Sequence, residues 1–236
     1  MSASEALAKA ESIDGYRAAC DASILNSVAR ENHVYAPSFL EQPEMTRLYK
    51  CISLIPLVRK TDVVVMHASA DNGYPHTRPN AIICLPSSAM GDNESLSETL
   101  LHEAIHVHQR HYPELWSTAC SRDGWTQLSI DQVPTEFVRR CRINPDTMSC
   151  PFWAWERFHV PLPLFIRDDY PTLGGVGIKW LDLRNGALFE EQPTTFTARY
   201  GSNPPQPEHP YELLAVEYAA AKLKTDDALR TKLQSI

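Results

Sequence analysis

The segment SLSETLLHEAIHVHQRHYPELW, Ser95 to Trp116, concentrates histidine and glutamate. Within it His102 and His106 are four residues apart in the sequence HEAIH, and Glu103 directly follows the first histidine. Residues four apart on an α-helix project from one face, so two neutral imidazoles at this spacing can bind one metal ion. The Glu103 carboxylate would then point toward a water on that ion, where a general base is needed. Since random order would produce this motif in roughly 2% of chains of this composition, we interpret it as a zinc site.

The residues around the motif predict that it lies on an amphipathic helix. Ser95, with Glu98 three residues later, matches a capping box and predicts a helix start near Ser95. His108 and His111 lie on another side of that helix or near its end, so we expect structural roles for them. The expected buried stripe consists of Leu96, Leu100, Leu101, Ala104 and Ile105.

HEAIH and the apolar positions around it resemble the active-site helix of the zincin metallopeptidases. The metzincin branch is excluded, because HExxHxxGxxH requires glycine and histidine where this chain has Gln109 and Tyr112. The gluzincin branch takes its third ligand from a glutamate on a later helix, often in a Glu-x-x-Ala context. The resemblance implies a zincin-like α+β fold: a small β-sheet packs on the active-site helix, and a second ligand-bearing helix lies near the C-terminus. It also implies a Zn²⁺ cofactor and hydrolysis of peptide or amide bonds by a zinc-activated water, with Glu103 as general base.

The sequence HPYELLAVEYAA near the C-terminus offers the third ligand. Pro210 is typical of the first turn of a helix, which would place Glu212 in that turn. Alanines along the same helix would let it approach the HEAIH helix closely. We therefore expect His102, His106 and Glu212 to hold the metal. Glu217 or His209 would take the third position if the helix starts or faces differently.

Residues just before the motif could bind substrate. The loop GYPHTRP contains Tyr74, His76 and Arg78, any of which could stabilise a developing oxyanion. In zincins, as the resemblance implies, a strand beside the active-site helix binds extended substrate through main-chain hydrogen bonds. NAIICLP, residues 80–86, is the candidate for that strand.

The remaining pattern predicts one zincin-like α+β domain over residues 1–236. We expect residues 1–58 to form a helical scaffold and residues 59–236 to form the catalytic core. Two short β-rich runs, TDVVVMHAS and NAIICLP, precede the motif, with an irregular loop between them. A further helix is expected near residues 131–141, followed by a Pro-, Trp- and Gly-rich middle of strands and loops.

Composition narrows the class of partner. The formal net charge is -7 without a Lys/Arg cluster, which argues against binding to nucleic acid or to an anionic membrane. No apolar run is long enough to span a bilayer and no signal peptide is visible, so a cytoplasmic location is expected. The six cysteines lack CxxC spacing and are expected to be reduced. A peptide or small-molecule substrate is therefore the expected partner.

Two alternatives to a peptidase stay open. The same zinc centre could act on a small non-peptide substrate, because a site constrains chemistry more than substrate. The protein could also bind metal without catalysis, although such a protein has no need of Glu103. A closed pocket lined by Trp153 or Tyr211 would favour a small molecule, whereas an open groove beside NAIICLP would favour a peptide. The sequence NPDT, residues 144–147, could line a pocket but is also an ordinary turn sequence, so no catalytic role is expected for it.

Overall fold

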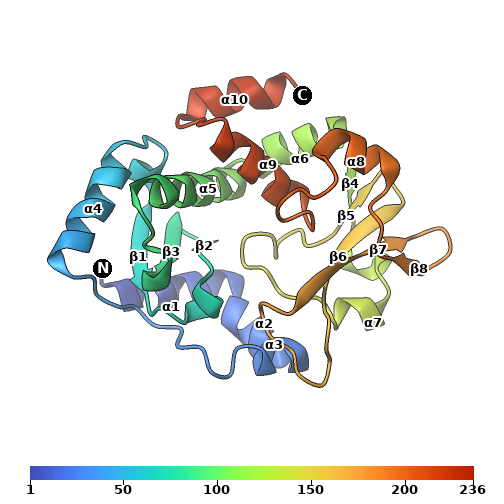
Figure 1. Cartoon of the computed structure of the whole chain (residues 1–236), viewed down its shortest axis with the longest axis horizontal. Helices are drawn as coiled ribbons and strands as arrows, with labels where there is room; N and C mark the ends of the chain where they lie inside the picture. Colours follow the sequence, from blue (N-terminus) through green and yellow to red (C-terminus); the bar gives the residue numbers. More distant parts are fainter.

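The computed structural model describes residues 1–236 and contains two β-sheets and ten α-helices (Figure 1). The expected α+β class is confirmed. The α-helices are α1 (Ala3–Asp14), α2 (Tyr16–Ala22), α3 (Ile24–Val28), α4 (Gln42–Ser53), α5 (Asn93–His111), α6 (Pro113–Arg122), α7 (Thr135–Val138), α8 (Thr194–Tyr200), α9 (Pro210–Ala220) and α10 (Asp226–Gln234). Short 3-10 helices are η1 (Val58–Lys60), η2 (Ala70–Gly73), η3 (Ser87–Ala89) and η4 (Ile130–Gln132).

The first sheet lies below α5 and contains β1 (Asp62–Met66), β2 (His76–Arg78) and β3 (Ile82–Pro86) in the order β1-β3-β2. Strand β1 pairs in parallel with β3, and β2 pairs antiparallel with it. Because β3 has a neighbour on each side, the expectation that residues 80–86 offer a free edge to a peptide is wrong. The residues of strand β2 were expected to form a loop because prolines flank them, at Pro75 and Pro79. The strand is only three residues long, so its pattern is hard to recognise.

The second sheet is an antiparallel meander in the order β4-β5-β6-β7-β8. Its strands form much of the middle segment that the sequence predicts as strands and loops. The helix expected near 131–141 is much shorter, because α7 covers only Thr135–Val138. The strands are β4 (Trp125–Gln127), β5 (Trp153–Trp155), β6 (His159–Phe165), β7 (Val176–Asp182) and β8 (Ala187–Phe189).

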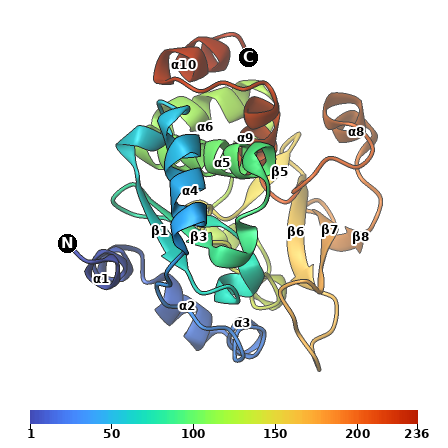
Figure 2. The ribbon, with the colours of Figure 1, turned by 60° about the vertical axis from the view of Figure 1, so that its left-hand side comes forward.

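Helix α1 shares a core with the first sheet. In α1, Leu7 and Ala10 are buried in a cluster that includes Met66 and Ile82 of the sheet. Figure 2 shows α1, α2 and α3 together at one end of the molecule. The six cysteines are free and buried, and no helix is both long and apolar enough to cross a membrane.

Helix α5 lies against α9, and this contact positions the candidate site. The expected apolar stripe of α5 is buried, and Ala104 belongs to the same core cluster as Ala215 of α9. Small side chains at such a crossing let two helix backbones approach closely. Burial of each large apolar side chain in this cluster contributes about 1.5–3 kcal/mol.

Both helices begin with side-chain caps. Helix α5 begins at Asn93, and the Asp92 side chain accepts a hydrogen bond from the Ser95 backbone N–H. The expected cap at Ser95 is therefore three residues late, because an aspartate also satisfies a first-turn N–H. Helix α9 begins at Pro210 as expected, which places Glu212 in its first turn.

Candidate metal centre

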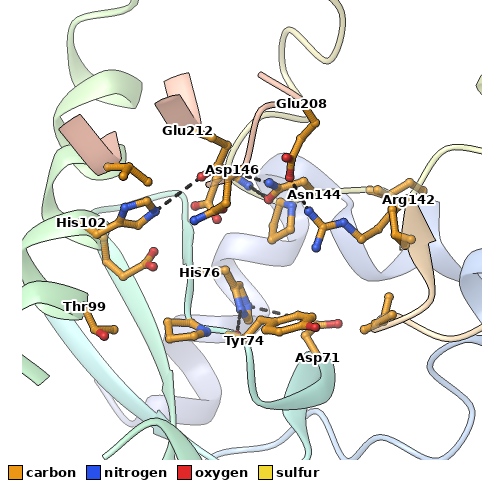
Figure 3. A pocket seen from close by; sticks show the side chains of 18 of the residues that line it. Asp71, Tyr74, His76, Thr99, His102, Arg142, Asn144, Asp146, Glu208 and Glu212 are labelled. Atoms are coloured by element: carbon orange, nitrogen blue, oxygen red, sulfur yellow. Dashed lines mark hydrogen bonds and ion pairs between the residues drawn. The ribbon is translucent and has the colours of Figure 1, made fainter. Parts of the chain in front are cut away.

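Three potential ligand atoms converge between α5 and α9. The Nε2 atoms of His102 and His106 are 3.0 Å apart. Oε2 of Glu212 lies 3.1 Å from Nε2 of His106 and 3.4 Å from Nε2 of His102 (Figure 3). Ligand atoms of a tetrahedral zinc ion with bonds of about 2.0–2.1 Å lie about 3.3 Å apart. The three side chains could therefore hold one metal ion.

The charges of these side chains also favour a cation between them. Burial alone would raise the pKa of Glu212, but the imidazoles of His106 and His102 hold it well below its usual range. Burial alone would lower the pKa of His106, but the Glu212 carboxylate outweighs it and raises this pKa to about 10. A buried carboxylate beside two imidazoles thus gains stability from a positive charge placed among them.

Gln109 fixes the orientation of His106. Its Nε2 donates to the carbonyl oxygen of Tyr211 over 2.9 Å, so its Oε1 must be the atom that faces Nδ1 of His106, 2.6 Å away. In the neutral form that can bind a metal, His106 therefore carries its proton on Nδ1 and presents the lone pair of Nε2 toward the other candidate ligands. From the sequence, Gln109 serves only to exclude the metzincin pattern. Its position three residues after His106 was the signal for this contact.

Asn144 holds the third ligand from the opposite side. Its Nδ2 donates to Oε1 of Glu212 over 2.7 Å, which leaves Oε2 directed at the two histidines. Asn144 also accepts the backbone N–H of Asp146 through Oδ1. From the sequence, residues 144–147 could line a pocket or form an ordinary turn. They line the cavity at this site, and Asn144 supplies a partner to the candidate metal-binding carboxylate.

Glu103 lies at the same site without a partner for its charge. The residue is only 4% exposed, and its Oε2 accepts no hydrogen bond. Burial raises the pKa of Glu103 to about 7, and the nearby Asp146 carboxylate adds to this shift. Buried carboxylates are usually hydrogen-bonded, so Glu103 is an exception that calls for a role.

A cavity of about 730 Å³ opens beside the three ligands. Both His102 and Glu103 line it, together with Glu212 and the segment 142–146. Strand β7 contributes an apolar part of the wall, as does the side of α9 that follows Glu212. The apolar residues of these two elements are Val176, Ile178, Val216, Ala219 and Ala220.

Tyr74 lines this cavity, and it is the one of the three candidate oxyanion residues that is exposed, with 41% of its surface accessible to solvent. His76 also lines it, but Nδ1 contacts the Tyr74 carbonyl oxygen and Nε2 contacts the Tyr35 hydroxyl. Arg78 does not line it, because its buried guanidinium is paired with Asp14 and Glu11. An oxyanion role for Arg78 is therefore wrong in this structure.

Tyr211 and Trp153 lie outside the cavity. Both are buried, and Tyr211 instead lines a separate cavity on another side of α5, with Gln109 and Arg110. No residue of 80–86 lines the first cavity either. The sequence offered two alternative substrate features, an open groove beside residues 80–86 or a pocket closed by these aromatic residues, and neither lies at the three candidate ligands.

The alternatives for the third ligand point elsewhere. Glu217 pairs with Arg199 over 3.2 Å. His209 caps α9 by accepting the Tyr211 N–H, and its other ring nitrogen contacts the Cys150 carbonyl oxygen. His108 contacts Trp116 and Asp226 instead of the site. Glu212 is thus the carboxylate that the structure brings to the two histidines.

Comparison of the chain with models of protein families, with curated proteins and with solved structures finds no match. Since one fold can carry many activities, the chemistry of the site is the guide to the function of this chain.

Proposed function

We propose that this protein is a zinc-dependent hydrolase of peptide or amide bonds, with a gluzincin-like ligand set of His102, His106 and Glu212. Two imidazoles and one carboxylate are a common protein ligand set for catalytic zinc. When bound, zinc supplies Lewis acidity and lowers the pKa of water. A divalent ion also fits the spacing of the ligand atoms, between 3.0 and 3.4 Å.

The observation that carries the proposal is the unpartnered Glu103 carboxylate. It follows the first ligand in sequence, lines the cavity and has a buried oxygen with no hydrogen bond. A carboxylate in this position can take a proton from the attacking water and pass it to the leaving nitrogen. A protein that only stores or binds metal has no use for this group, and its burial without a partner destabilises the fold.

The cavity argues for a small substrate. Its volume of about 730 Å³ lies within the range of pockets that enclose small ligands. Short peptides and amino-acid amides therefore suit it better than long extended chains. Tyr74 lines the same cavity with a partly exposed side chain, and we assign its hydroxyl to donate a hydrogen bond to the substrate carbonyl oxygen as negative charge develops on it.

The variant Glu103→Gln tests this proposal. It removes the proton acceptor and preserves the size of the side chain, so zinc should remain bound while turnover falls by about a hundredfold or more. The assay is hydrolysis of a library of short fluorogenic peptides and amides by zinc-loaded protein, with metal content measured in parallel. Glu94→Gln, an exposed change on the same helix, is the matched control.

Two results would refute the proposal. One is that the zinc-loaded wild type cleaves no member of the library, and the other is that Glu103→Gln cleaves at the wild-type rate. Loss of zinc from Glu103→Gln would instead assign a metal-holding role to this side chain.

A further inference from the structure

Asp146 is a second carboxylate at the metal end of the cavity, and only one of its oxygens is engaged. Oδ1 accepts hydrogen bonds from the backbone N–H of Thr77, over 2.7 Å, and from the Thr77 hydroxyl. Asp146 is 8% exposed, yet its Oδ2 accepts no hydrogen bond and joins no ion pair within 4.0 Å. Figure 3 shows Asp146 beside Glu212 and Asn144. One oxygen is therefore anchored, and the other lacks a donor.

Negative charge exceeds positive charge at this end of the cavity. Four carboxylates line it there: Glu98, Glu103, Asp146 and Glu212. A divalent ion held by His102, His106 and Glu212 would compensate Glu212 and also Glu103, which is only partly charged because burial raises its pKa to about 7. Asp146 would still lack a cation in contact. The site would therefore still attract a further cation when metal is bound.

The arginines near the cavity are already engaged. Arg30 pairs with Asp71 over 2.9 Å, and Arg142 pairs with Glu208 over 2.8 Å. Arg110 donates to the Thr77 hydroxyl and to the carbonyl oxygens of Thr77 and Pro145, so its guanidinium lies near Asp146 but forms no ion pair with it. No cationic side chain therefore contacts Oδ2 of Asp146.

We propose that Asp146 binds the ammonium group of the substrate, which makes the substrates peptides with a free amino terminus or amino-acid amides. This inference rests on the proposed hydrolase function. In such molecules a single carbon separates the ammonium nitrogen from the carbonyl carbon that reacts. An ammonium held by Asp146 would therefore bring that carbonyl to Glu103 and the metal ligands. The apolar wall formed by β7 and α9 suits an aliphatic side chain on the same amino acid.

A matched pair of substrates tests the inference on the wild-type protein. One is the fluorogenic coumarin amide of L-leucine, and the other is its N-acetyl derivative, which lacks the positive charge. A charge-assisted hydrogen bond contributes about 1.5–3 kcal/mol, so kcat/KM should be about 10- to 100-fold higher for the free amine. Equal rates, or faster cleavage of the acetylated amide, would overturn the inference.

The variant Asp146→Asn tests whether the preference for the free amine over the acetylated amide depends on Asp146. The amide oxygen can still accept from Thr77, while the negative charge is lost. The ratio of the two kcat/KM values should fall by about tenfold or more, because the ammonium loses its charged acceptor. Asp131→Asn, an exposed change on η4, is the matched control and should leave the ratio at the wild-type value. An unchanged ratio in folded Asp146→Asn would also overturn the inference.

A binding measurement separates this inference from the proposed function. Calorimetry on zinc-loaded Glu103→Gln protein compares L-leucinamide with N-acetyl-L-leucinamide. If the wild type cleaves nothing but L-leucinamide binds at least about tenfold more tightly, the hydrolase proposal fails and the ammonium site stands. If both amides bind equally, the ammonium site fails whatever the enzyme cleaves. Two zinc ions per chain, with the second lost in Asp146→Asn, would identify Asp146 as a ligand of metal and also overturn the inference.

Discussion

Two groups of buried charges line the same cavity and differ in how their polar atoms are satisfied. In one group, the Arg30 guanidinium donates to Asp71, to Asn26, to the Tyr16 hydroxyl and to the carbonyl oxygen of Ile143. Oδ2 of Asp71 accepts no hydrogen bond, but the Asp71 carboxylate has the Arg30 guanidinium as a counter-charge at 2.9 Å. In the other group, Glu103 has neither a hydrogen bond at its buried oxygen nor a cationic side chain in contact, and three ligand atoms face one another. Charges paired with a guanidinium hold a fold together, whereas a buried carboxylate without such a partner points to a missing ion or substrate.

Substitution of Arg30 should have the largest effect, and that effect should be on folding. Arg30→Met would leave Asp71 buried without its closest cation, so the free energy of unfolding should fall by about 3–5 kcal/mol. Denaturant titration measures this loss. Arg167→Met, which breaks an exposed pair with Asp169, should cost less than about 1 kcal/mol.

The same variant tests whether the two groups are independent. Folded Arg30→Met protein should bind zinc within about threefold of the wild-type affinity, since Arg30 does not contact the ligands. A large loss of zinc affinity with little loss of stability would show that the Arg30 group belongs to the metal site.

Substitution of Glu212 should act on metal binding first. Glu212→Gln replaces a charged ligand by a neutral and poorer donor, so zinc affinity should fall by roughly a hundredfold or more, about 2.7 kcal/mol. Competition with a chromogenic chelator measures this change. Glu217→Gln, on the same helix but paired with Arg199, should stay within about threefold of the wild type. The reverse ranking of these two variants would contradict the assignment of the third ligand.

The sequence could predict those parts of the site that lie within one helix turn. HEAIH fixes the spacing of the two histidines, and Pro210 fixes the helix turn that carries Glu212. NPDT was recognised as a possible pocket lining, but the contact of Asn144 with Glu212 and the role of Asp146 could not be predicted, because NPDT is also an ordinary turn sequence. Their place depends on Thr77 in β2 and on Arg110 in α5, which anchor this turn from distant parts of the chain.

The sequence also predicted only part of the fold. Strands β1 and β3 were recognisable as β-rich runs, whereas β2 is too short for its pattern to show between two prolines. The order of the first sheet makes β3 central, and no local pattern carries that information. The peptide-binding edge inferred from the zincin resemblance therefore failed, although the helix beside it was predicted.

The smallest expected effect concerns Gln109, which links the two kinds of interaction. Its amide is satisfied on both sides, by His106 and by the Tyr211 carbonyl oxygen, yet it acts on a metal ligand. Gln109→Leu has similar volume and loses both hydrogen bonds, so His106 could adopt the wrong tautomer or rotate. Zinc affinity should fall by about tenfold, the lower end of the range for partners of metal-ligating histidines. Gln42→Leu, the same change on the exposed start of α4, should leave zinc affinity unchanged. If Gln109→Leu lowered stability but kept wild-type zinc affinity, Gln109 would stabilise the fold, as Arg30 does, and would have no role in metal binding. Gln109 would then have to be assigned to the Arg30 group instead of the metal site.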